Sequence, residues 1–88
     1  MDPEEMLAEL ERLAQRLGMT VRYEATGGRV GRCLLRGEPV ILVEARLPLR
    51  DKVEGLALAL ADLDYSALFV PEAVRDLLES KRSGRGNS

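Results

Sequence analysis

The stretch Val53–Leu63, with the sequence VEGLALALADL, decides how the rest of this chain is arranged. From Gly55 to Ala61 it has seven consecutive residues without a polar side chain. A surface helix keeps one polar face at a period of 3.6 residues. This segment instead has an apolar stripe on one side and the apolar Leu58 on roughly the opposite side. We therefore predict a central helix, at about Leu49–Leu63, that is buried on more than one side.

A first helix is predicted from Pro3 to Leu17. Asp2 suits the N-cap, Pro3 the first helical position and Glu5 the third position of a capping box. Gly18 is the residue expected to end the helix. Apolar side chains recur at helical spacing and are expected to face the core: Met6, Leu7, Leu10, Leu13, Ala14 and Leu17.

Three strands are predicted between the two helices, at Met19–Glu24, Val30–Arg36 and Val40–Val43. The first alternates apolar and polar residues, and turn sequences follow each of the first two at Gly27-Gly28 and Gly37-Glu38-Pro39. This order predicts an antiparallel meander.

Two-residue turns in that meander would pair Leu35 with Val40 and Val21 with Leu34. One face of the sheet would then hold Met19, Val21, Tyr23, Leu34, Ile41 and Val43. The other would hold Cys33, Leu35, Val40 and Leu42.

The C-terminal part is predicted to end in a short helix. Leu68–Val70 is expected as a fourth strand or an extended connector, and the helix as running from Pro71 to about Ser80. No side chain of Lys81–Ser88 can enter a core, so we expect a disordered tail. The fold class is α+β, with one domain over residues 1–80 and a tail over residues 81–88.

The composition favours a small cytoplasmic protein. The chain has 88 residues, a net charge of −2, one cysteine and no histidine. A single cysteine fits a reducing compartment, and no apolar stretch approaches the length of a membrane span. Eleven arginines against two lysines suit a GC-rich or thermophilic source.

The residue types needed for catalysis or metal binding are scarce. The lack of histidine removes the commonest general base and metal ligand. Cys33 therefore has no activating partner, and we predict that it packs in the core. Asp62 and Asp64 lie at the C-terminal end of the predicted central helix, where we expect contact with an arginine of the sheet or of a partner, or a cap on the next loop. We predict no catalytic residue, cofactor or metal, and no enzyme activity.

Four arginines on the predicted strands could form a basic patch: Arg22, Arg29, Arg32 and Arg36. The predicted register places the first two on one face of the sheet and the last two on the other. Without interleaved aromatic residues, solvated arginines are favoured over a nucleic-acid site. The glycines of Gly27–Gly31 match neither a P-loop nor a dinucleotide fingerprint.

The order of elements resembles the core of the ImmA/IrrE-type zinc peptidases. The resemblance rests on the Gly27-Gly28 hairpin, the strand Val40-Ile41-Leu42-Val43 and the segment Arg46-Leu47-Pro48-Leu49 leading into a helix. Where that family has a His-Glu-x-x-His motif, this chain has Leu56–Leu60, so the resemblance implies neither the metal nor the activity. The chain also resembles small uncharacterised bacterial proteins.

We therefore expect a non-enzymatic interaction or regulatory protein that forms a homodimer. The two-sided apolar helix leaves Leu58 without cover in so small a chain, and the small side chains of Ala59 and Ala61 would let a second helix approach. The alternatives are a nucleic-acid-binding module that uses the arginine-rich sheet, and a degenerate peptidase-like domain that binds a peptide.

Overall fold

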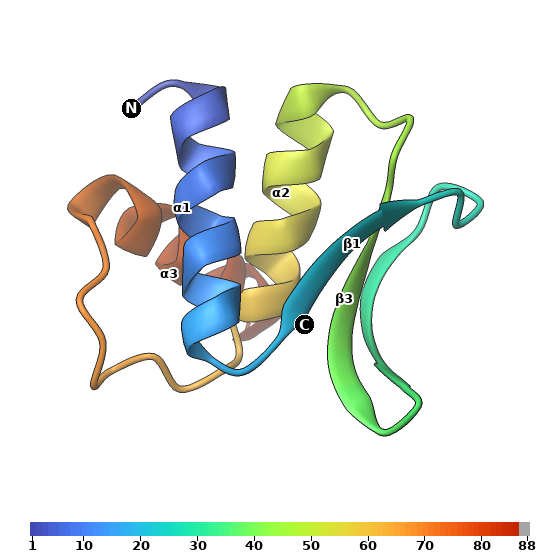
Figure 1. The fold of residues 1–88 in the computed structure, drawn as a ribbon. Helices are drawn as coiled ribbons and strands as arrows, with labels where there is room; N and C mark the ends of the chain where they lie inside the picture. The colour runs from blue at the N-terminus through green and yellow to red at the C-terminus, as the bar shows by residue number, and fades with distance from the viewer. Residues whose placement is uncertain (87–88) are drawn as a thin grey trace.

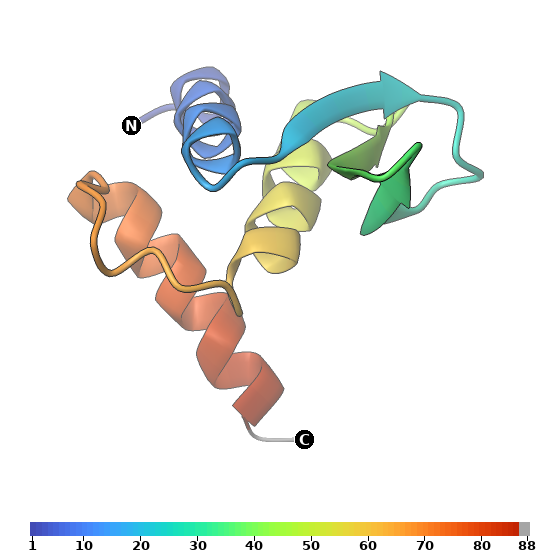
Figure 2. The ribbon, with the colours of Figure 1, turned by 60° about the horizontal axis from the view of Figure 1, so that its bottom comes forward.

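Two helices pack on one face of a three-stranded sheet, and a third helix packs against those two helices (Figure 1, Figure 2). The structure is a computed structural model that describes residues 1–86, with side chains for residues 1–82. The elements are α1 (Pro3–Arg16), β1 (Thr20–Glu24), β2 (Val30–Leu35), β3 (Glu38–Glu44), α2 (Leu49–Leu60) and α3 (Glu72–Gly86). The predicted α+β class is confirmed.

Helix α2 is the centre of the fold, as predicted. It packs against α1, α3, β2 and β3, and Figure 1 shows it between α1 and the sheet. Leu56, Ala57 and Leu60 have no exposed surface, whereas Leu58 is 42% exposed. The helix ends three residues before the predicted Leu63.

The predicted meander is wrong, because β3 lies between the other two strands. The strand order is β1-β3-β2, with β1 parallel and β2 antiparallel to β3. The most apolar strand, Val40–Val43, thereby gains a neighbour on both sides, which suits a strand without polar positions. Gly27-Gly28 is accordingly not a hairpin turn: the segment 25–29 passes the end of β3 to reach the far edge.

The β2–β3 turn is Arg36-Gly37 rather than Gly37-Glu38-Pro39. Both turn residues have positive φ, 53° and 83°, as the two-residue turn of type I′ requires. Leu35 therefore pairs with Glu38 and Cys33 with Val40, not Leu35 with Val40.

The corrected pairing leaves the predicted faces intact. The shift between β2 and β3 is two residues, which returns every side chain to the same face. Val21 pairs with Ile41 of the parallel neighbour instead of with Leu34. Helices α1 and α2 cover the face that holds Ile41 and Val43, and the other face is open.

The capping residues predicted for the first helix are confirmed. Asp2 Oδ1 accepts the Glu5 N–H at 2.9 Å, and Gly18, at φ 84°, ends α1. Leu68–Val70 forms no strand, and α3 buries Val74 and Leu78.

Helix α3 continues to Gly86 instead of ending near Ser80. The expected disorder is therefore wrong for residues 81–86. Arg82 explains part of the difference, because its Nε donates to Ala61 O at 2.7 Å and its Nη2 to Leu63 O at 3.0 Å. The expectation for Asn87 and Ser88 lies outside the described residues.

Candidate interaction surface

Strand β2 forms an exposed edge of the sheet. Its outer side pairs with no other strand of residues 1–86. Gly31 to Leu35 are all exposed, and Leu34 reaches 72%. An uncovered edge strand presents unpaired backbone groups and is a template for pairing with another chain.

The hairpin register indicates which backbone groups of β2 face outward. The residues that flank a two-residue turn exchange hydrogen bonds, and the pattern alternates along an antiparallel pair. Because Leu35 and Glu38 flank the turn, residues 31, 33 and 35 bond to β3. The N–H and C=O groups of Val30, Arg32 and Leu34 therefore face away from the sheet.

Helix α2 lies beside this edge and contributes apolar side chains. At Gly55 the helix lies so close to Val30 that a Cβ on Gly55 would meet the valine side chain. One turn further on, Leu58 and Ala59 line a hollow of about 150 Å³, together with Gly31 and Arg32. We call the outer side of β2, together with Leu58 and Ala59, the edge surface.

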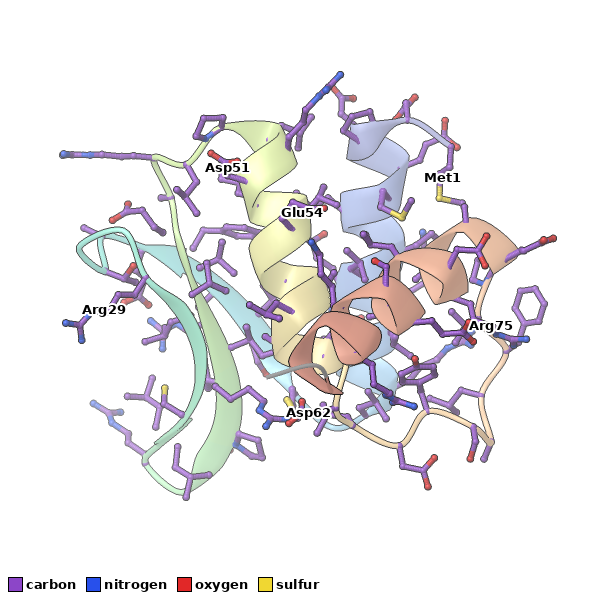
Figure 3. The ribbon with its side chains drawn as sticks, turned by 180° about the vertical axis from the view of Figure 1, so that it is seen from behind. Met1, Arg29, Asp51, Glu54, Asp62 and Arg75 are labelled. Carbon is purple, nitrogen blue, oxygen red and sulfur yellow. The ribbon has the colours of Figure 1, made fainter. Side chains whose placement is uncertain are left out.

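An ion pair joins the middle of β2 to the segment that follows α2. Arg32 Nη2 lies 3.1 Å from Asp62 Oδ2, and Figure 3 shows Asp62 at the C-terminal end of α2. This confirms the expected contact between an aspartate after the central helix and an arginine of the sheet. Both side chains are more than a third exposed, so the pair orients β2 on α2 more than it stabilises the fold.

Two of the three predicted interface residues reach the edge surface, and the third does not. Leu58 is exposed and Ala59 is 9% exposed beside it, so both reach the edge surface. Ala61 is fully buried in the core, and we leave it out of the interface.

The four predicted arginines do not come together. Arg22 and Arg36 line a hollow on the open sheet face, where Arg22 pairs with Glu24 at 2.6 Å. Arg29 lies in the connection between β1 and β2 and points away from the molecule in Figure 3. Arg32 lies on the helical face. The predicted division of these arginines is wrong, because Arg22 shares a face with Arg36 and not with Arg29.

Cys33 is exposed, and the prediction that it packs in the core is wrong. It lies on the open face of an edge strand, where no helix of the described chain covers it. Leu56 and Leu60, which stand where the zinc peptidases have the two histidines of their motif, are fully buried. They face the core and not a cleft.

Glu44 is a structural carboxylate that the sequence did not reveal. It is 7% exposed, and its Oε1 accepts the N–H groups of Thr26 and Gly28 at 3.0 Å, while Oε2 accepts that of Arg46. These backbone donors hold the pKa of Glu44 below its usual range. The side chain thereby fastens the connection between β1 and β2 to the end of β3.

Another hollow, of about 560 Å³, lies beyond the end of α2. Within it, Asp64 accepts both the N–H and the hydroxyl of Ser66, which lowers its pKa and confirms the predicted loop cap. The guanidinium of Arg82 lies 5.1 Å from the ring centre of Tyr65. This cluster has no signature in the sequence, because its members come from two separate segments. They are Asp62, Leu63, Asp64, Tyr65, Ser66, Arg75, Glu79 and Arg82.

Comparisons give this chain no relatives: no protein family, curated protein or solved structure matches it. The described residues contain no group of three or more potential metal-binding side chains. Among the described helices, none has both the length and the apolar content needed to cross a bilayer.

Proposed function

We propose that this chain is a non-enzymatic, cytoplasmic interaction protein that forms a homodimer through the edge surface. One observation carries the proposal: the exposed Leu34 and Leu58 flank a strand edge whose backbone groups have no partner strand. Apolar side chains beside unpaired backbone groups are typical of strand-addition interfaces.

A second copy of the chain is the simplest partner for this surface. In an isologous contact both copies use the same surface patch, so one apolar edge per chain is enough to form the dimer. A chain of this size buries only about 60–65% of its unfolded surface, and self-association adds to that burial.

Phe69 is an alternative apolar contact for a partner, with 78% of its surface exposed. It borders a separate hollow whose other lining includes Glu9, Arg12 and Arg16. Leu13, Val70, Pro71 and Val74 also line this hollow, but it lacks the backbone edge that β2 provides, so we favour the edge surface.

Light scattering coupled to size exclusion tests the proposal on the full chain at tens of micromolar. The parent protein is expected to be a dimer, and Leu58→Glu a folded monomer, since a charge there would be buried in the interface. Phe69→Glu is the matched control and is expected to remain a dimer. A monomeric parent would refute the proposal. If Phe69→Glu alone is a monomer, the interface lies at the hollow beside Phe69 instead.

A further inference from the structure

We infer that the second copy adds its β2 strand antiparallel to the first, with the two-fold axis at Cys33. The inference rests on the proposed homodimer and specifies its geometry. The two sheets would become one sheet of six strands, in the order β1-β3-β2-β2-β3-β1.

Backbone hydrogen bonding limits the possible registers. Only Val30, Arg32 and Leu34 direct their polar groups outward, so an even-numbered residue must pair with an even-numbered residue of the second copy. Two symmetric registers pair five residues of β2 with five of the other copy. One has its axis at Arg32 and the other has it at Cys33.

Charge and shape separate these two registers. An axis at Arg32 places the two Arg32 side chains directly opposite each other, and like charges in that position are destabilising. An axis at Cys33 places Arg32 opposite Leu34 of the second copy. It also places the exposed Leu35 opposite Gly31, where a Cβ would meet nothing within 4 Å.

The helical layer supports the same register. Leu58 lies beside Gly31 and Arg32, and Arg32 is the residue that faces Leu34 of the second copy. Each Leu58 therefore covers the Leu34 of the other copy. These are exposed leucines of α2 and β2, at 42% and 72%, and the contact occurs twice.

The spacing of the two α2 helices allows this contact. Helix α2 packs over both β2 and β3, and adjacent strands lie about 4.8 Å apart. If each α2 axis lies between its β2 and β3, the two axes would be about 10 Å apart, which is within the range of packed helices.

The single thiol tests this register in the native chain. In the Cys33 register the two Cys33 residues form a non-hydrogen-bonded pair with a Cα separation of about 4.5 Å, within disulfide range. Diamide, a two-electron thiol oxidant, would convert the two thiols to a disulfide and itself be reduced to the hydrazine. We expect a covalent dimer on a non-reducing gel, and none from Cys33→Ser.

Two further variants make the result specific. Leu34→Ser alters an exposed side chain, so it should fold like the parent by circular dichroism, and it should raise the dimer dissociation constant about tenfold or more. Phe69→Ser should leave both the constant and the cross-linking unchanged.

The outcomes separate the inference from the proposed function. A dimer in light scattering that forms no Cys33 disulfide overturns the register and leaves the homodimer intact. A monomer overturns both. A dimer that cross-links equally well in Leu34→Ser, with an unchanged dissociation constant, overturns the contact between Leu34 and Leu58.

Discussion

Gly55 of α2 lies against Val30 of β2 so closely that a Cβ built on Gly55 would come within 2.7 Å of Val30 Cγ2 and 3.1 Å of its Cβ. Valine has a stiff χ1 angle, so the methyl group cannot easily turn aside. A glycine in the middle of a helix is normally unfavourable. Here it sets the distance at which α2 crosses the edge strand.

Gly55→Ala is expected to destabilise the protein despite the better helix propensity of alanine. The propensity gain is about 1 kcal/mol, and overpacking costs about 1–3 kcal/mol. In a Val30→Ala background the 2.7 Å contact with the methyl group is gone and only the 3.1 Å contact with the Cβ remains, so the same substitution should cost less free energy of unfolding. Urea unfolding of the four proteins gives the coupling energy. A stabilising Gly55→Ala in the parent chain would show that the contact is loose.

Arg82→Ala is expected to lower the free energy of unfolding by about 1 kcal/mol, because its guanidinium hydrogen-bonds two carbonyls after the end of α2. Arg75→Ala removes another arginine from the same hollow and should have less effect. Thermal melting compares the two variants. Equal melting temperatures would mean that Arg82 does not hold α3 to α2.

Acid should destabilise the parent partly through Glu44. The pKa of Glu44 is lowered in the folded state from 4.5, so its carboxylate stabilises the fold above that value, and this stability is lost as the pH falls through the lowered pKa. Glu44→Gln should reduce the melting temperature near pH 7 and flatten its fall toward about pH 3. Glu24→Gln, on the paired residue of β1, is the control. Parallel melting curves for the parent and Glu44→Gln would contradict this role.

Two tyrosines should respond oppositely to loss of their hydroxyl groups. Tyr65 Oη is buried and has no hydrogen-bond partner among the described residues, so Tyr65→Phe should be neutral or stabilising by up to about 1 kcal/mol. Tyr23 donates its hydroxyl to Glu11, and burial and that carboxylate raise its pKa, so Tyr23→Phe should destabilise. Chemical denaturation measures both. A destabilising Tyr65→Phe would reveal a bound water or another partner at that hydroxyl.

Sequence analysis predicted the elements whose signals are local. Asp2, Gly18 and the apolar run of α2 act within a few residues, so the first two helices begin where expected. Strand order was not predictable in this way, because the alternation in β1 is satisfied equally by β2 or β3 as a neighbour. The prediction for Cys33 rests on the usual burial of free cysteines, whereas Cys33 lies on the open face of the edge strand β2.

The candidate site was predicted only in part. Leu58 is identifiable from the sequence, because it lies outside the apolar stripe of its own helix. Glu44 has no local signature, because its partners belong to a connection whose path depends on the strand order.

The central position of β3 also bears on aggregation. Val40-Ile41-Leu42-Val43 is short, apolar, uncharged and β-branched at three of its four positions, which is the composition that forms stacked fibrils when a strand edge is free. A meander would have left this segment at the margin of the sheet. In the observed order it is paired on both sides, and the strands left at the margins carry Arg22 and Glu24 in β1 and Arg32 in β2, charges that oppose uncontrolled stacking.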